Sequence, residues 1–210
     1  MQREAVLKLY YMPGACSLAT HILLREAGLP VELERVGRDK RTEHGENFLD
    51  VTPKGYVPAL RMEDGDILTE NIVVHNYIAD LRPNAKLAPP HGSKPRLRQD
   101  ELAVFISTEI HKTYGPMFNP ATNEETRQQQ RNKLVDRYAF IEKILSDGRP
   151  YLTGENFATV DAYLFTVTRW ADGQKVDLSK FPKVLAFQKR VGERPAVKAA
   201  LEAEGLNKPA

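Results

Sequence analysis

Cysteine is nearly absent from this sequence, which has one, Cys16, in 210 residues. A single thiol excludes an intramolecular disulfide and the several thiolates of a structural zinc site. No apolar run approaches the ~18 residues of a membrane-spanning helix. The first residues contain a glutamate and lead into no small-residue cleavage site, so we expect no signal peptide, no membrane contact and a cytoplasmic protein.

An excess of charge of one sign is also missing. The chain has 30 Lys and Arg against 28 Asp and Glu, a net charge of +2, which disfavours nucleic acid as the main partner. Hydrophobic residues make up 41% and charged residues 28%, as is typical of a globular chain. This length favours one large domain or two small ones.

The first third of the chain alternates between strand and helix patterns. Residues 6–11 are apolar and aromatic, residues 17–27 have helical spacing that ends at Gly28, and residues 31–34 alternate with period two. This order predicts a βαβ unit with two parallel strands. A short helix at 48–51 and a strand–turn–strand–helix series at 57–81 complete the pattern βαβ-α-ββα.

A proline-rich stretch at 83–95 is the only convincing linker, so we expect domains at 1–82 and 96–210. The second domain reads as all-α, a bundle of helices. The helix predicted at 160–170 is apolar on nearly all sides and should lie at the centre of that bundle.

Cys16 follows a strand and begins a helix, in the segment Pro13-Gly14-Ala15-Cys16-Ser17. Unpaired N–H groups and the positive end of the helix macrodipole favour a thiolate there, so we expect a pKa below that of a free thiol. The alternative is a buried cysteine that acts as a small hydrophobe.

Two other segments are open to a structural or a functional interpretation. Val57-Pro58 lies in a strand pattern, which indicates an edge strand, a bulge, or a cis peptide whose backbone pairs with an extended ligand. Thr69-Glu70-Asn71 opens a helix and either caps it, holds a ligand's carboxylate and ammonium, or does both. The five histidines have no metal-ligand spacing, so we expect no metal.

Taken together, these motifs resemble those of a cytosolic glutathione transferase of the bacterial beta class. The resemblance covers about residues 7–206, and its carrying segments are 9–18, 53–60, 68–70, 109–112, 161–165 and 194–197. It implies a thioredoxin-like α/β domain that binds glutathione, followed by an all-α domain with the electrophile pocket, in a homodimer. Glutathione is then a co-substrate in a detoxification reaction.

The resemblance also implies roles for individual residues. Cys16 would face the glutathione sulfur, with Tyr11 and Ser17 in support. Val57, before Pro58, would pair with the cysteinyl backbone of glutathione. The remaining ligand contacts would come from Glu70 and Asn71 to the γ-glutamyl end, and from Lys40 to the glycyl carboxylate.

The helical domain would contribute to the same site. His111 and Lys112 would approach the thiol as cations, His111 in a catalytic role, and Thr108 would lie one turn earlier. Arg96 would reach the neighbouring subunit's site. Val104 stands where close relatives have asparagine, Asn71 where serine or glycine is usual, and Ala158 where a capping hydroxyl is expected.

These observations give three hypotheses for function. The first is a transferase that conjugates the glutathione thiolate to small hydrophobic electrophiles, a thiolate stabilised by the helix end and nearby donors. The second is glutathione-dependent monothiol disulfide exchange, or a peroxidase, through Cys16. The third is a non-catalytic carrier of hydrophobic compounds. The sequence does not name the physiological electrophile.

Overall fold

The structure is a computed structural model that describes residues 6–206 of the chain. The predicted domain ends at 1–5 and 207–210 lie outside the described residues. The chain forms two compact units: Met1–Leu87 together with Pro195–Ala210, and Ala88–Arg194. None of the helices in the described part of the chain is long and apolar enough to cross a membrane.

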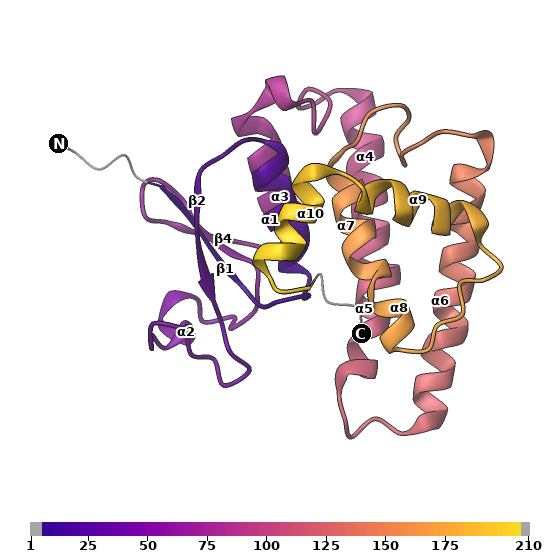
Figure 1. Cartoon of the computed structure of the whole chain (residues 1–210), viewed down its shortest axis with the longest axis horizontal. Helices are drawn as coiled ribbons and strands as arrows, with labels where there is room; N and C mark the ends of the chain where they lie inside the picture. Colours follow the sequence, from indigo (N-terminus) through magenta and orange to yellow (C-terminus); the bar gives the residue numbers. More distant parts are fainter. Residues whose placement is uncertain (1–5, 207–210) are drawn as a thin grey trace. The chain divides into compact units, whose positions relative to one another are not determined.

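The first unit is built on a four-stranded sheet in the order β2-β1-β3-β4 (Figure 1). β1 (Leu7–Tyr11) and β2 (Val31–Arg35) are parallel, which confirms the predicted βαβ unit. β3 (Ala59–Arg61) pairs antiparallel with β1 and with β4 (Ile67–Thr69). The Val57–Pro58 peptide is cis and precedes β3, so the proline does not interrupt the ladder.

Successive residues of β1 face different helices. The Tyr10 ring lies 5.6 Å from that of Phe48 in α2 (Phe48–Val51), in a core cluster with Val36 and Ala59. The next residue, Tyr11, contacts His21 of α1 (Ser17–Glu26), with ring centroids 6.2 Å apart. The period-two geometry of a strand therefore gives the sheet one face toward α2 and the other toward α1.

Two further helices complete the first unit. α3 (Asn71–Leu81) packs against α1, and η1 (Pro83–Ala85) follows it. α10 (Pro195–Ala203) also packs on α1 and lies beside it in Figure 1. The contacts thus group the last helix with the α/β unit, although it had been expected in the helical domain.

The second unit, Ala88–Arg194, is entirely helical apart from its loops. Its elements are α4 (Lys94–Phe105), η2 (Ile106–His111), α5 (Lys112–Tyr114), η3 (Gly115–Phe118), α6 (Glu124–Ile144), η4 (Leu145–Asp147), α7 (Thr159–Thr168), α8 (Trp170–Gly173) and α9 (Pro182–Gly192). All ten residues of α7 are buried, which confirms the predicted central helix.

The long helix expected after the linker is not uniform. α4 gives way at Ile106 to η2, a π-helical segment that ends at His111. π-helical turns inside helices are rare and are frequent at functional sites. The hydrophobic spacing of the sequence did not predict this change of hydrogen-bond pattern.

Candidate active site

Cys16 is the N-cap residue of α1, as its place between a strand and a helix predicted. It is a free thiol, and the thiol donates a hydrogen bond to the Val57 carbonyl oxygen over 3.2 Å. Two motifs that lie 41 residues apart in the chain therefore meet at one sulfur atom.

Opposing effects act on the ionisation of this thiol. The Asn71 side chain and the backbone N–H groups of Cys16 and Ser17 act to lower the pKa of the thiol and favour a thiolate. Burial acts in the opposite direction and is the largest effect, and the Glu70 carboxylate adds to it. The pKa of Cys16 is therefore raised, and the lowered pKa expected from its place at the helix end is wrong. The local donors are there, but desolvation outweighs them.

Ser17 and Tyr11 are both buried in the first unit. The Ser17 hydroxyl donates to the Met12 carbonyl over 3.3 Å and accepts from the Met12 N–H over 3.2 Å, which closes the turn before α1. Burial, followed by the nearby Glu204 carboxylate, raises the pKa of Tyr11. Any bond from Ser17 to a ligand thiolate would have to replace its bonds to Met12.

Glu70 lies at the start of α3 with φ at +71°, an unusual value for a residue other than glycine. Its side chain makes no capping bond, so the capping alternative is not realised by Glu70. Instead its carboxylate pairs with the Lys54 ammonium at 2.8 Å, and Lys54 also donates to the Thr69 hydroxyl at 2.8 Å. The Glu70 side chain is 66% exposed, so a ligand in solution can reach its carboxylate.

Lys40 lies on the loop between β2 and α2. Its ammonium donates to the Gly55 carbonyl oxygen over 2.7 Å and stands 5.7 Å from the centre of the exposed Tyr56 ring. Gly55 has φ at +61°, and a Cβ there would meet the Leu49 side chain at 2.9 Å. This glycine allows the tight turn that presents its carbonyl to Lys40.

A buried chain of bonds joins the C-terminal helix segment to the turn before Cys16. Glu204 accepts from the Gly14 N–H over 2.9 Å with one oxygen and from His21 Nδ1 over 2.9 Å with the other. Arg25 Nε donates to His21 Nε2 over 2.9 Å, so this histidine is the neutral Nδ1–H tautomer. The Gly14 backbone is therefore held from residue 204.

His111, in the second unit, is enclosed by aromatic side chains. Its Nδ1 bonds the Tyr163 hydroxyl over 2.7 Å, and its ring centre lies 5.1 Å from that of Trp170. Burial, followed by the charge of Lys112, lowers the pKa of His111 to about 4. His111 is thus neutral at pH 7, and its expected role as a cation is wrong.

The other predicted residues of the second unit differ in exposure. Lys112 and Thr108 are exposed, and the Thr108 hydroxyl donates to the Val104 carbonyl over 3.0 Å. Arg96 is buried, donates to the Pro89 carbonyl over 3.0 Å and pairs with Asp100 at 3.5 Å. The Arg96 side chain would have to break these contacts to extend toward another subunit.

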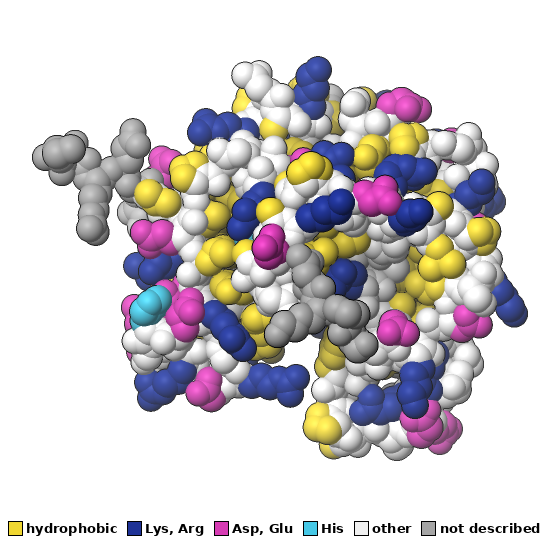
Figure 2. Space-filling model, viewed as in Figure 1, with side chains coloured by type: hydrophobic (Ala, Val, Ile, Leu, Met, Phe, Trp, Pro, Cys, Tyr) yellow, Lys and Arg dark blue, Asp and Glu magenta, His cyan; other side chains and the backbone are white. Residues whose placement is uncertain are grey.

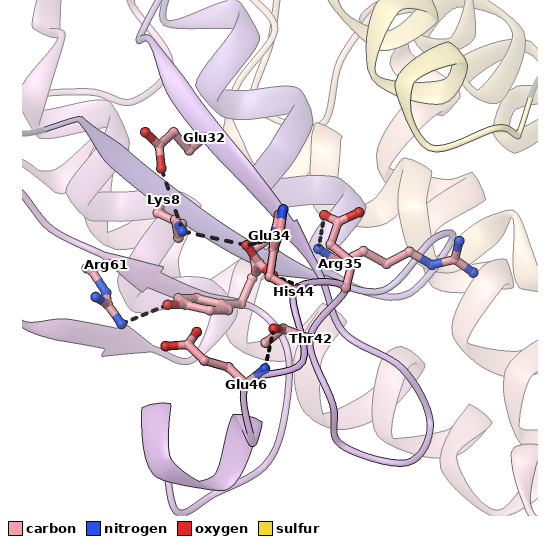
Figure 3. A network of polar contacts seen from close by, with 10 residues as sticks. Lys8, Glu32, Glu34, Arg35, Thr42, His44, Glu46 and Arg61 are labelled. Carbon is pink, nitrogen blue, oxygen red and sulfur yellow. Dashed lines mark hydrogen bonds and ion pairs between the residues drawn. The ribbon is translucent and has the colours of Figure 1, made fainter.

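One group in the described part of the chain has metal-ligand spacing. Ligand atoms of Glu34, Glu43 and His44 lie within 4.8 Å of one another. Glu34 and His44 belong to the network of polar contacts in Figure 3. These atoms already have partners: both oxygens of Glu34 bond His44 Nδ1, at 2.8 and 2.9 Å, and Glu43 accepts from the Arg35 N–H. Lys8 also lies 3.6 Å from Glu34, so a cation of the protein already pairs with this carboxylate.

Two protein-family models match most of the chain. The model described as glutathione S-transferase, N-terminal domain, matches residues 5–80, and the one described as glutathione S-transferase, C-terminal domain, matches residues 105–195. The chain belongs to the glutathione S-transferase family. The fold confirms this, with a thioredoxin-like first unit and a helical second unit.

Relatives of this transferase chain are similar over nearly their whole length. Glutathione S-transferase GstA of Escherichia coli O157:H7 is 43% identical over 95% of this chain and 100% of its own. The crystal structure of a glutathione transferase from Methylococcus capsulatus is 52% identical, with a TM-score of 0.94 over 96% and 100% of the two chains. The beta-class transferase of Sphingomonas chungbukensis is 38% identical, with a TM-score of 0.91 over 95% and 99%.

Three features of this transferase were missed by the sequence analysis. They are the effect of the Asn71 side chain on the pKa of Cys16, the bond from the Lys54 ammonium to Glu70, and the bond from the Gly14 N–H to the Glu204 carboxylate. Glu70 and Asn71 were predicted as site residues from their place at the start of a helix. That place indicates neither the pair with Lys54 nor the effect on Cys16. Glu204 lies 190 residues from Gly14, and no local pattern links the two.

Proposed function

We propose that this chain conjugates the thiolate of glutathione to small hydrophobic electrophiles, as a beta-class glutathione transferase. The observation that carries the proposal is the hydrogen bond from the Cys16 thiol, at the start of α1, to the Val57 carbonyl oxygen. A helix N-terminus with nearby N–H donors favours a thiolate over a thiol. For a glutathione thiol bound beside Cys16, these donors would favour the thiolate that attacks the electrophile.

The α/β unit supplies the groups that suit each end of glutathione. Glu70 is exposed and already binds an ammonium, that of Lys54, so it can exchange Lys54 for the γ-glutamyl ammonium. The first N–H groups of α3, including that of Asn71, suit the γ-glutamyl carboxylate. Val57, before Pro58, would pair with the cysteinyl backbone, and Lys40 would take the glycyl carboxylate.

The helical unit would supply the electrophile pocket. We assign Lys112 and Thr108 to its polar wall, and His111 to it as a neutral group that the Tyr163 hydroxyl orients. We further propose that Arg96 reaches the neighbouring subunit of a homodimer. We keep the domain bounds 1–82 and 96–210 with the linker 83–95, except that the last helix belongs with the first unit. A lone free thiol suits the reducing cytoplasm, where we place the protein.

A second activity rests on the same sulfur. Cys16 is the only cysteine in the chain, so any disulfide exchange or peroxidase chemistry would be monothiol and would pass through a mixed disulfide with glutathione. A raised pKa slows such chemistry at neutral pH, which ranks it second to conjugation.

Calorimetric titration with glutathione, followed by an assay of conjugation to an aryl halide, tests the proposal. We expect saturable binding and conjugation above the rate of free glutathione. Binding of hydrophobic compounds without glutathione binding or conjugation would favour the carrier hypothesis instead.

A further inference from the structure

Arg127 lies in the first turn of α6 and bonds the backbone of the loop that precedes this helix. Its Nη1 donates to the Met117 carbonyl oxygen over 2.6 Å and its Nη2 to that of Asn119 over 2.7 Å. Its Nε donates to the Thr122 carbonyl oxygen over 3.0 Å. Hydrogen bonds from a charged donor are stronger than neutral ones, and the planar guanidinium keeps its donors in fixed directions. One side chain therefore fixes three peptide groups of one short loop.

Phe118 lies between two of these bonded residues, Met117 and Asn119. It is 51% exposed, yet its ring packs against that of Trp170, with ring centres 5.2 Å apart and planes at 87°. An exposed ring has few neighbours to fix its position, so its place depends on the backbone that carries it. Arg127 bonds the carbonyl group on either side of Phe118, and these bonds therefore determine where the ring lies.

Trp170 connects this loop to a residue of the proposed electrophile pocket. Its ring centre lies 5.1 Å from that of His111, which the proposed function places in the pocket. His111, Trp170 and Phe118 thus form a row of three rings in the helical unit, and Phe118 is the most exposed of them. Such a row suits a planar, apolar electrophile, because contacts between aromatic rings are favourable beyond the area that they bury.

We propose that Arg127 is a positioning residue for the electrophile pocket, where it holds the Phe118 ring beside Trp170. The proposal rests on the function proposed above and extends it, since that function assigns no residue of this loop. In this role Arg127 does not touch the electrophile but acts through the backbone on both sides of Phe118. A lysine at this position would keep the charge but lose the fork of donors.

The other bonds of the loop do not tie it to a helix. The Thr122 hydroxyl donates to the Pro116 carbonyl oxygen over 2.6 Å, and the Asn119 N–H donates to the same oxygen over 3.2 Å. These bonds close the loop on itself, whereas Arg127 connects it to α6. Met117 is buried and keeps the loop against the helical unit. Removal of the Arg127 donors should therefore shift Phe118 without unfolding the protein.

The first test is quenching of Trp170 fluorescence by acrylamide in the whole protein without glutathione. Trp170 is the only tryptophan in the chain, so the signal reports on its contact with Phe118. We expect Arg127→Met to increase quenching, because the ring that covers the indole moves away, and Phe118→Ala to increase it equally. Lys133→Met is the matched control, since Lys133 is an exposed cation on the same helix. It should leave quenching unchanged.

The second test compares the KM for an aryl halide with the KM for glutathione. Arg127→Met should raise the KM for the aryl halide about tenfold and keep kcat and the KM for glutathione within about twofold, because only electrophile binding is weakened. General damage to the structure would change all three. Phe118→Ala should give the same rise, and the double variant should add nothing, since both changes remove one contact.

If Arg127→Met does not fold, Arg127→Lys decides the question, and it should show the same changes to a smaller degree. Unchanged quenching, an unchanged KM for the aryl halide, or independent effects in the double variant would overturn the proposal. If the wild type neither binds glutathione nor conjugates it, the proposed function fails instead. The quenching, which needs no glutathione, then decides alone whether Arg127 holds Phe118 beside Trp170.

Discussion

The Gly14 N–H donates to the Glu204 carboxylate over 2.9 Å, and this bond ties the last helix segment to the turn that carries Cys16. The other oxygen of Glu204 is bonded by His21, whose side chain is fully buried. The placement of the site cysteine thus depends on residues from both ends of the described chain. A purely N-terminal fragment would lack this contact.

Glu204→Ala should destabilise the protein by about 3–5 kcal/mol, because it leaves the donors of His21 and Gly14 buried without an acceptor. Glu204→Gln keeps an acceptor for one of them and should cost less. Urea denaturation of the two variants, read by circular dichroism, gives the comparison. Equal midpoints for wild type and Glu204→Ala would contradict this account of the turn.

Glu70→Ala should weaken glutathione binding about tenfold, because a charge pair with the ligand ammonium is lost. We expect the lower end of the usual range, since the Glu70 side chain is 66% exposed. Lys54→Met is the matched control, because it removes the internal cation that competes for Glu70 and should not weaken binding. Unchanged affinity of Glu70→Ala in calorimetry would remove Glu70 from the site.

The cap of the central helix α7 gives a stability prediction. Ala158 is the N-cap residue, and its N–H donates to Asp161 over 2.7 Å, but its side chain offers no acceptor. The Thr159 hydroxyl does not cap the helix in place of Ala158, because it accepts from the Gln99 side chain over 2.8 Å. The Ala158→Thr variant should therefore be more stable than the Ala158→Val variant by about 1 kcal/mol. Valine has the shape of threonine but lacks its hydroxyl. Equal denaturation midpoints for the two variants would show that the hydroxyl does not cap the helix.

Two histidines with lowered pKa values should make stability depend on pH. The pKa of His75 is lowered to about 3 and that of His111 to about 4, mainly by burial. Both take up a proton on unfolding below about pH 6.5, so their stabilisation is complete above that pH and is lost as the pH falls toward 4. Between pH 7 and pH 5 each should lower the free energy of unfolding by about 2 kcal/mol.

The comparison of wild type with His75→Gln and His111→Gln at both pH values isolates this effect. Each variant should lose about 2 kcal/mol less than wild type between pH 7 and pH 5. The comparison is needed because Asp161, with a pKa raised to about 7 by burial, contributes with the opposite sign. The same loss in wild type and both variants would contradict the assignment of neutral histidines.

Local patterns predicted most of the fold because its elements have strong local signals. The period-two alternation within β2 and the all-round apolar segment of α7 are examples, and both elements formed as expected. The nearly equal numbers of basic and acidic residues also predicted a surface of mixed charge. Side chains of both signs are interspersed on the face shown in Figure 2. These properties depend on residues near one another in the chain.

The properties of the candidate site depended on contacts that the chain does not encode locally. The charge of His111 is decided by Tyr163 and Trp170, which lie more than 50 positions away and enclose it. The ionisation of Cys16 is decided by burial, which helix position alone does not reveal. Local patterns could therefore nominate candidate site residues, but they could not predict the protonation states of those residues.

The most direct test of the central claim compares Cys16→Ala with wild type in two assays, conjugation of glutathione to an aryl halide and reduction of a mixed disulfide. The account predicts that conjugation is largely retained, because α1, Asn71 and Glu70 stay in place, whereas disulfide exchange is lost, because no other cysteine can replace Cys16. Absence of conjugation from both proteins, or disulfide exchange that persists in Cys16→Ala, would contradict it.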